Sequence, residues 1–534
     1  MSDQAETAHI ASEVSRRRTF AIISHPDAGK TTLTEKLLLY SGMIRTAGMV
    51  RGRKGSKAAS SDWMGMEQER GISITASAMQ FNYKDALINV LDTPGHQDFS
   101  EDTYRTLTAA DSAVMVIDAS KGVETQTKKL FAVCRMRNIP VLTFMNKMDL
   151  NVRDPFELME EVEDLLGVQA SPVNWPVGYG KEFAGIADCR TKDLLLFAKA
   201  SAGGAQRATM RRVALADADP ELQASVLEQL RYELELLDEA GNPFSAEGFL
   251  AGKITPVFFG SALTNFGVEP FFDHFVNLAP CPGSRPADTD GGEEILVDPV
   301  TRPFSAYVFK IQANMNPRHR DSMAFMRVCS GKFERETPVK HHRLGKEIRL
   351  SRSHSMLAGE RATLDTAFAG DIIGAINPGT FAIGDTVSLE GGFQYKPLPQ
   401  FPPEVVAQIR LIDVSKRKAF DKGMMQLSQE GAVQVLRSWD NPLSEPYVAA
   451  VGRLQFEVLQ YRLKEEYGVE TKLEALPYET GTWLSGDVRS FRKPSSALMV
   501  RDVKDRPVLL FRSPWEKQYA ADQNPNHKLI DFIE

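Results

Sequence analysis

The chain has 534 residues, of which 43% are hydrophobic and 25% are charged, and its formal net charge is −7 at pH 7. These values are ordinary for a globular protein, exclude a low-complexity chain, and leave room for about three or four domains. Four widely spaced cysteines with no CxxC pair argue against a zinc site or a disulfide framework and suit a reducing cytosol. The polar N-terminus lacks the apolar core of a signal peptide, and no apolar run is long enough to span a membrane. We therefore expect a cytoplasmic protein.

Charge is unevenly distributed along the chain. Between Val213 and Gly248 there are nine acidic residues and one basic residue. Between Thr301 and Arg361 there are thirteen Lys or Arg, five Asp or Glu, and four histidines. Both segments fit ordinary solvated faces, but the second also fits a local basic face that binds the phosphates of a nucleic acid.

Residues 24–32 read Ser-His-Pro-Asp-Ala-Gly-Lys-Thr-Thr and stand between a strand-like run, 19–23, and a helical pattern, 33–39. A loop of this kind that ends in Gly-Lys-Thr is typical of a phosphate-binding loop, in which loop amides and the helix N-terminus face the anion. Lys30 would reach the β- and γ-phosphates, and the Thr31 hydroxyl would hold Mg²⁺. Because Ser24 replaces the first glycine of the usual pattern, a polar turn is the alternative.

A second motif, Asp92-Thr93-Pro94-Gly95-His96, follows the strand-like run 86–91. A carboxylate at the end of a strand can hold Mg²⁺ through water. Gly95 has no side chain, so its amide can approach a γ-phosphate closely.

Two further motifs predict guanine recognition. Asn146-Lys147-Met148-Asp149 follows the apolar run 140–145, and Asp149 is placed to accept both N1–H and the 2-amino group of guanine. Adenine lacks that pair of donors, so the motif selects GTP over ATP. Residues Ser261, Ala262 and Leu263 follow the run 254–259, and a backbone amide there can donate to guanine O6.

Residues 16–281 alternate strands with helical patterns, which predicts a mostly parallel α/β sheet with helices on both faces. The gap between Asp149 and Ser261 is longer than one strand–helix unit requires. We therefore expect an insertion at about 155–253, partly helical and acidic, on the rim of the nucleotide domain.

The remainder predicts a β-barrel followed by an α+β domain. Short β-rich runs punctuated by glycine fill about 303–389, and from about 401 strand and helix patterns alternate, with helices at 420–438 and 454–467. The predicted division is a nucleotide (G) domain at 1–283, a linker at 284–300, a barrel at 301–392 and an α+β domain at 393–534.

Residues 25–32, 70–75 and 92–99 resemble translational GTPases of the elongation factor G type. Residues 62–70 and 100–107 are more similar to the bacterial peptide chain release factor 3 family. This resemblance implies a ribosome-dependent GTPase of translation termination that promotes dissociation and recycling of the stop-codon-reading (class 1) release factors. It also implies a monomer that binds ribosomal proteins and ribosomal RNA, with the sarcin–ricin loop as the trigger of hydrolysis.

The resemblance also implies residue roles. His96 would orient the attacking water, and Asp27 would help to hold a cation. For His25 we expect no catalytic role and only packing of the loop. Ser73 stands where most relatives have threonine, and its hydroxyl can still bind Mg²⁺, although it lacks the methyl group that restricts χ1. The predicted catalytic residues are Lys30, Gly95 and His96; the predicted Mg²⁺ ligands are Thr31, Ser73 and Asp92. The predicted GTP contacts are Ser24, His25, Pro26, Asp27, Ala28, Gly29, Lys30, Thr31, Thr32, Asp92, Thr93, Pro94, Gly95, His96, Asn146, Lys147, Met148, Asp149, Ser261, Ala262 and Leu263.

Three alternatives share the predicted G domain. A translocase and a tetracycline-type ribosomal protection factor both need further C-terminal domains, for which this chain leaves no room. A GTP-dependent ribosome assembly factor would use hydrolysis only incidentally, and the intact set of Lys30, Asp92 and His96 argues against it.

Overall fold

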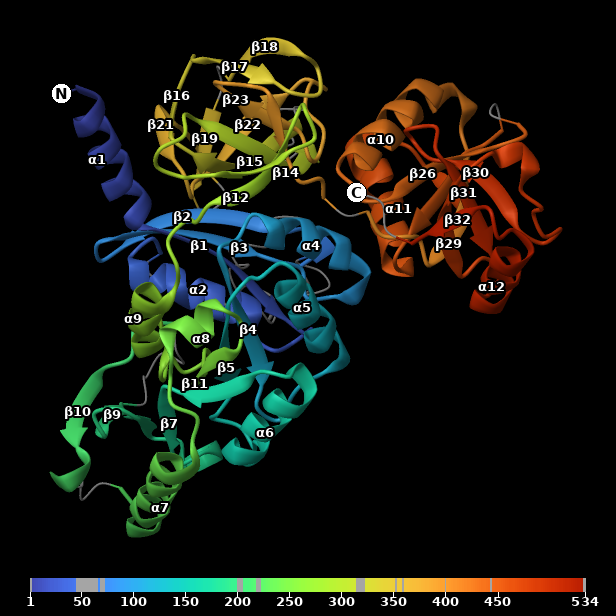
Figure 1. Cartoon of the computed structure of the whole chain (residues 1–534). Helices are drawn as coiled ribbons and strands as arrows, with labels where there is room; N and C mark the ends of the chain where they lie inside the picture. The colour runs from blue at the N-terminus through green and yellow to red at the C-terminus, as the bar shows by residue number, and fades with distance from the viewer. Residues whose placement is uncertain are drawn as a thin grey trace.

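The structure is a computed structural model that describes residues 2–44, 66–67, 73–198, 205–217, 222–313, 322–350, 353–357, 360–398, 400–441 and 444–531. The chain forms three parts in sequence order (Figure 1). An α/β domain comes first, a β-barrel lies against one edge of it, and a C-terminal domain lies beside both. In this part of the chain, no helix is both long and apolar enough to cross a membrane.

Seven described strands form the central sheet of the α/β domain in the order β2-β3-β1-β4-β5-β11-β6. Only β2 runs antiparallel to its neighbour, so the predicted mostly parallel α/β fold is confirmed. The strands are β1 (Arg17–Ser24), β2 (Ser77–Tyr83), β3 (Ala86–Asp92), β4 (Ser112–Asp118), β5 (Val141–Asn146), β6 (Gln169–Pro172) and β11 (Ile254–Phe259).

Helices cover both faces of this sheet because its strands are apolar on both sides. In β1, Phe20 and Ile22 point into one core with α2 and α9, while Ala21 and Ile23 point into the other core with α4, α5 and α6. This arrangement brings the carboxyl ends of the parallel strands to one edge of the sheet. The helices that cover the sheet are α2 (Lys30–Ser41), α4 (Ser100–Thr108), α5 (Thr125–Met136), α6 (Pro155–Leu166) and α9 (Val268–Leu278), whereas α1 (Ser2–Ser15) contacts the barrel.

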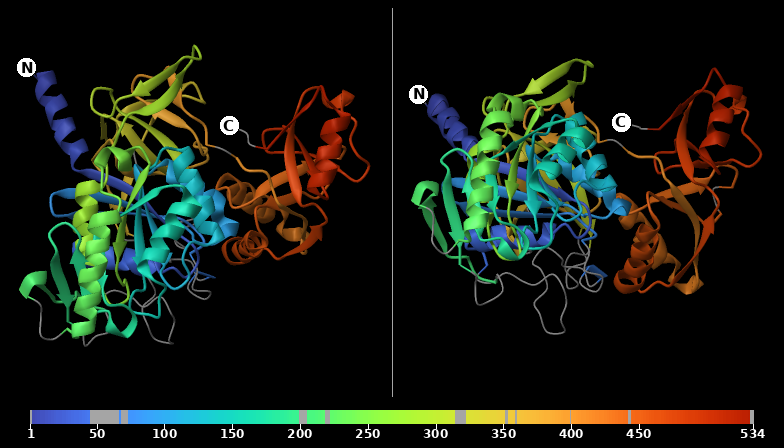
Figure 2. Two further views of the ribbon diagram at one scale, coloured as in Figure 1. Left: turned by 60° about the horizontal axis from the view of Figure 1, so that its bottom comes forward. Right: turned by 90° about the horizontal axis from the view of Figure 1, so that it is seen from below.

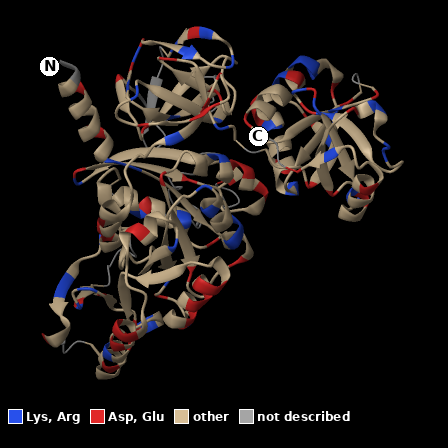
Figure 3. Cartoon of the chain, viewed as in Figure 1, with Lys and Arg blue, Asp and Glu red and all other residues tan. Residues whose placement is uncertain are grey.

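The segment predicted as a partly helical insertion contains a sheet that the sequence analysis did not expect. Within the described residues, four antiparallel strands form it in the order β10-β9-β8-β7, while α6 and β6 belong to the central fold. Acidic residues gather on α6 and α7 (Figure 3). The elements of the insertion are β7 (Asn174–Val177), β8 (Gly185–Asp188), β9 (Asp193–Phe197), β10 (Met210–Ala214), α7 (Ala224–Ala240) and α8 (Ala246–Leu250).

Residues 284–300 were expected to form a linker, but they form the hairpin β12 (Arg285–Thr289) and β13 (Glu294–Val297), and β12 also pairs with β24 (Phe393–Tyr395). The Gly-rich stretch that suggested a linker is the tip of this hairpin, where Gly292 has a φ of +81°.

The predicted barrel is present. Its main described sheet has the strand order β18-β17-β23-β14-β15-β22-β19-β20, and a separate pair joins β16 to β21. The strands are β14 (Ser305–Ala313), β15 (Ser322–Ser330), β16 (Lys332–Glu334), β17 (Pro338–His341), β18 (Lys346–Arg349), β19 (Ser353–Leu357), β20 (Glu360–Thr363), β21 (Thr366–Phe368), β22 (Ile372–Asn377) and β23 (Thr386–Ser388).

The C-terminal domain has a described sheet in the order β28-β25-β27-β26-β30-β31-β29-β32. Figure 2 shows this domain beside the α/β domain. Its strands are β25 (Val405–Leu411), β26 (Gln434–Ser438), β27 (Tyr447–Ala450), β28 (Thr471–Leu476), β29 (Thr480–Ser485), β30 (Leu498–Arg501), β31 (Pro507–Phe511) and β32 (Lys528–Ile530), and its helices are α10 (Arg417–Gln429), α11 (Arg453–Tyr467) and α12 (Pro514–Gln523).

The prediction of a helix at 420–438 is wrong for the second half of that range. Helix α10 ends at Gln429, Gly431 turns the chain with a φ of +72°, and 434–438 form strand β26. The helix predicted at 454–467 is confirmed as α11, which ends at Gly468 in the left-handed conformation.

Two cations of the predicted basic segment, Lys310 and Arg327, face the protein interior. Arg327 is 1% exposed and donates to Asp111 Oδ2 at 2.5 Å and to the Gly370 carbonyl at 2.6 Å. Lys310 is also buried and donates to the Ala76 carbonyl. These two cations join the barrel to the α/β domain, so the excess of basic residues in the sequence overstates the exposed positive charge.

Candidate nucleotide site

The predicted phosphate loop connects β1 to α2 at the carboxyl edge of the sheet. Gly29 is the N-cap of α2 and has a φ of +96°, and no side chain caps the helix. A Cβ at Gly29 would lie 2.3 Å from Asn146 Nδ2, so glycine is required by space as well as by conformation. The first-turn amides of α2 are therefore left to bind an anion.

Lys30 and Asp92 meet at the mouth of this loop. The two side chains are 6% and 2% exposed and form an ion pair. The second carboxylate oxygen of Asp92, Oδ2, is buried without a hydrogen-bond partner among the described residues. A buried acceptor with no donor is costly, and a hydrated cation would satisfy it.

Thr31 and Ser73 also converge at this place. Their hydroxyl oxygens lie 3.4 Å apart although the residues are 42 positions apart in the sequence. Together with the unpartnered oxygen of Asp92, which contacts the adjacent Lys30, these two hydroxyls would make an all-oxygen donor set of the kind that suits Mg²⁺. Thr31 and Ser73 therefore lie together, and Asp92 contacts Lys30, which precedes Thr31 in the chain, whereas Arg70, Gly71 and Ile72 of the same motif lie outside the described residues.

Gly95 packs against the phosphate loop. A Cβ placed on it would lie 3.6 Å from the Ser24 and His25 carbonyls and from the Pro26 nitrogen. Two threonines fix the turn before it: Thr93 donates to the Ile22 carbonyl at 2.7 Å, and Thr103 donates to the Pro94 carbonyl at 3.1 Å.

His96 follows directly and is partly solvent-accessible, with 33% of its side chain exposed. Its Nδ1 accepts a hydrogen bond of 3.2 Å from the Asp98 amide and so caps the short 3₁₀ turn η1 (Gln97–Phe99). The ring is therefore held at the start of this turn.

His25 is fully buried under the loop. Neither ring nitrogen has a hydrogen bond among the described residues, and Nε2 lies 3.5 Å from Glu124 Oε2. Burial lowers the pKa of His25 despite the nearby Glu124, so the ring is neutral at pH 7. This environment suits the loop-packing role expected of His25.

The guanine motif joins three loops. Asn146 donates to the Ala28 carbonyl at 2.7 Å and accepts from the Ala262 amide at 2.8 Å. Lys147, with a φ of +70°, donates to Asp118 Oδ2 at 2.7 Å. Burial raises the pKa of Asp118, but hydrogen bonds from Lys147 and Ser120 outweigh burial and hold that pKa below its usual value.

Asp149 has a buried Oδ1 without a hydrogen-bond partner among the described residues. Asp149 lies three residues after Asn146. The hydrogen bonds of Asn146 join this motif to the phosphate loop and to the loop of Ser261, Ala262 and Leu263. The four predicted motifs therefore converge on one site at the carboxyl edge of the sheet.

Two supporting residues were missed by the sequence analysis. Asp118 is the last residue of β4 and pairs in register with Asn146, the last residue of β5. Asp92 is likewise the last residue of β3. That shared position at a strand end was a usable signal. Thr103 lies inside a helix, and its contact with Pro94 had no signal in the sequence.

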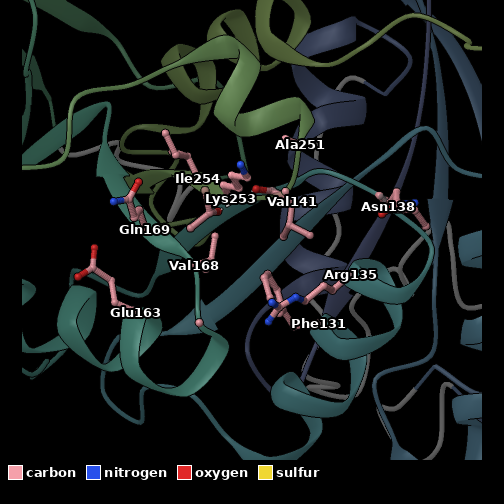
Figure 4. Close-up of a pocket in the computed structure, with 14 residues that line it drawn as sticks. Phe131, Arg135, Asn138, Val141, Glu163, Val168, Gln169, Ala251, Lys253 and Ile254 are labelled. Atoms are coloured by element: carbon pink, nitrogen blue, oxygen red, sulfur yellow. Dashed lines mark hydrogen bonds between the residues drawn. The ribbon is translucent and has the colours of Figure 1, made fainter.

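A separate cavity of about 720 Å³ lies at the opposite, amino edge of the sheet. Figure 4 shows Arg135 and Lys253 among its lining side chains. None of the predicted site residues lines it, so it is distinct from the nucleotide site.

Comparison with known families agrees with the three-part fold. Residues 15–281 match the family described as Elongation factor Tu GTP binding domain, and residues 303–390 match Elongation factor G domain 2. Residues 395–521 match Class II release factor RF3, C-terminal domain. A crystal structure of a protein from Thermus thermophilus superposes with a TM-score of 0.69 at 19% identity, covering 91% of this chain and 72% of that one, which supports the fold.

Full-length relatives are more specific. Proteins named peptide chain release factor 3 from Gloeobacter violaceus and Symbiobacterium thermophilum are each 52% identical to this chain over 97% of both sequences. One from Synechocystis sp. is 51% identical over 95% of this chain and 93% of its own length. With a translational GTPase fold and four converging GTP motifs, the chain belongs to the peptide chain release factor 3 family.

Proposed function

We propose that this translational GTPase of termination couples GTP hydrolysis on the ribosome to dissociation of the stop-codon-reading release factors, which are thereby recycled. The full-length similarity to peptide chain release factor 3 is the observation that supports this role. The candidate nucleotide site would supply the chemistry that the role requires.

The site residues divide into guanine, phosphate and metal contacts. Asp149 would accept from N1–H and the 2-amino group, and the Ser261–Leu263 loop would donate to O6. Lys30 would leave Asp92 to bind the β- and γ-phosphates, beside the uncapped amides of α2. Asp27, with a φ of +65°, would help to hold a cation near the phosphates. Thr31, Ser73 and Asp92 would hold Mg²⁺, which neutralises phosphate charge when bound.

Catalysis would be in-line attack of water on the γ-phosphorus. Lys30 would stabilise charge on the phosphate oxygens, and the Gly95 amide would contact the γ-phosphate. His96 would orient the water once the ribosome draws its ring inward from the η1 turn. Loss of the γ-phosphate would release the segments around Ser73 and His96, and the domains would reorient.

The ribosome would be the partner, through ribosomal RNA that includes the sarcin–ricin loop and through ribosomal proteins, with the chain acting as a cytoplasmic monomer. The barrel would contact RNA through exposed cations of β18, because Lys346 and Arg349 form no ion pair with another described residue. Elsewhere in the basic segment, Arg343 pairs with Asp385 at 2.6 Å, and Arg318 and Arg320 lie outside the described residues.

The domain division stays part of this proposal. We place the G domain at 1–283 with its insertion, the barrel at 301–392 and the C-terminal domain at 393–534, and assign the 284–300 hairpin to the barrel side because β12 pairs with β24.

Steady-state hydrolysis of GTP and ATP by the purified protein, with and without ribosomes, tests the activity. We expect slow hydrolysis of GTP alone, strong stimulation by ribosomes and no ATP hydrolysis. Equal turnover of both nucleotides, or no stimulation by ribosomes, would contradict the proposal.

A further inference from the structure

Asp98 connects the catalytic segment to the C-terminal domain. Its carboxylate accepts a hydrogen bond of 2.8 Å from the Leu454 amide, in the first turn of α11. The side chain is only 12% exposed. A carboxylate at the N-terminus of a 15-residue helix satisfies a free amide and is favoured by the helix dipole.

The contact is close enough to exclude a side chain at the helix N-cap. A Cβ placed on Gly452 would lie 2.0 Å from Asp98 Cγ and 2.3 Å from both carboxylate oxygens. Gly452 has a φ of −148°, which any residue can adopt, so the backbone does not require glycine here, and the atoms nearest to an added Cβ are those of Asp98.

The same residue holds His96. The Asp98 amide donates to His96 Nδ1 at 3.2 Å, and the Asp98 carboxylate lies 3.4 Å from that nitrogen. Because one residue separates the two, Asp98 cannot shift without moving the turn that carries the His96 ring.

A buried apolar cluster reinforces this connection. Phe99, directly after Asp98, packs with Ile74 from the segment after Ser73 and with Val458 of α11. Helix α11 thus shares one buried cluster with the η1 turn that follows His96 and with the segment that follows Ser73.

We propose that Asp98 is a positioning residue for His96 and that the N-terminus of α11 holds Asp98 in place, so that the C-terminal domain sets the orientation of His96. This inference rests on the proposed role of His96. Docking of α11 favours one position of the η1 turn, and movement of the C-terminal domain on the ribosome changes that position.

Single-turnover GTP hydrolysis on ribosomes tests the inference with Asp98→Ala, Asp98→Asn and Gly452→Ala. We expect Asp98→Ala and Gly452→Ala to lower the maximal rate about fivefold or more, the scale of a coupling between contacting elements, without changing GTP affinity. Asp98→Asn keeps an oxygen that accepts from Leu454 and should retain most of the rate. Gly283→Ala is the matched control, because a Cβ there meets nothing within 4 Å.

Epistasis with His96 separates positioning from a structural role. In a His96→Ala background, Asp98→Ala should cause no further loss of rate, because its effect passes through the absent ring. An equal fold-loss in both backgrounds would overturn the inference, as would parental rates in both Asp98→Ala and Gly452→Ala. A parental rate for His96→Ala alone would instead refute the proposed role of His96. GDP affinity of each variant confirms that the G domain is folded. If Asp98→Ala does not fold, Gly452→Ala gives the result in both backgrounds.

Discussion

At the scale of single residues, the most informative atoms are two buried carboxylate oxygens that accept no hydrogen bond from the described residues. Asp149 Oδ1 and Asp92 Oδ2 are buried without hydrogen-bond partners in the described chain, and they occupy the positions where sequence reasoning expected a guanine base and a hydrated cation. Buried acceptors are rarely left unpaired unless a ligand completes them.

Asp149→Asn should change the base preference from GTP to XTP. The amide of Asn donates where xanthine offers a carbonyl, while guanine loses a charged acceptor. We expect GTP binding to weaken by about 2–4 kcal/mol, the cost of truncating one partner of a buried charged pair. Titration with both nucleotides measures this, and unchanged GTP affinity would refute the guanine assignment.

His96→Ala should leave GTP binding nearly intact and lower ribosome-stimulated hydrolysis by about 10² or more, the scale of one lost transition-state group. The reason is its place directly after Gly95, which packs against the phosphate loop. Stimulated turnover within a factor of two of the parent would show that His96 does not position the water.

At the scale of elements, the sequence predicted the positions of strands and loops better than it predicted which charged side chains are exposed. The strands around the four motifs were recognisable because they are apolar on both faces, whereas β26 was taken for helix because its apolar residues continue the helical spacing of α10. The charge count of the basic segment overestimated its exposed positive charge for a different reason. Counting charges cannot distinguish Lys310 and Arg327, which are buried at a domain contact, from cations that face solvent.

Lys346→Gln combined with Arg349→Gln should weaken ribosome binding and reduce its salt dependence. Removal of each cation that binds a phosphate should lower the slope of log affinity against log salt by about 1. Ribosome affinity at several salt concentrations measures this. Lys332→Gln with Arg335→Gln is the matched control, because those cations already pair with Glu334 and Asp365. Equal slopes for the parent and the β18 variant would mean that this face does not bind RNA.

At the scale of the whole molecule, a buried ion network joins all three domains. Arg462 of α11 pairs with Glu430 at 2.5 Å, and Glu430 accepts from the Ala313 amide of the barrel. Arg105 of the G domain donates to the Glu430 carbonyl at 3.3 Å. The domains were predictable from sequence, but this junction was not, because Arg105 and Glu430 lie 325 positions apart and no local pattern marks them.

Arg462→Met should destabilise the folded chain by about 3–5 kcal/mol, since it leaves Glu430 as an unpaired buried charge. Burial raises the pKa of Glu430 even with Arg462 present. Urea unfolding measures the loss, with Lys464→Met on the same helix as the control because its side chain is 62% exposed. A loss no larger than that of the control would show that the junction is not held by this pair.

Recycling of a class 1 release factor is the most direct test of the whole account. The measurement is the number of peptides released per release factor, from excess ribosomes stopped at a stop codon, with this protein and GTP. We predict many turnovers with the parent protein and about one with His96→Ala, which binds GTP but hydrolyses it about 10²-fold or more slowly. Turnover that is unchanged by omitting the protein, or that is as high with His96→Ala as with the parent, would contradict the claim that GTP hydrolysis at this site drives release factor recycling.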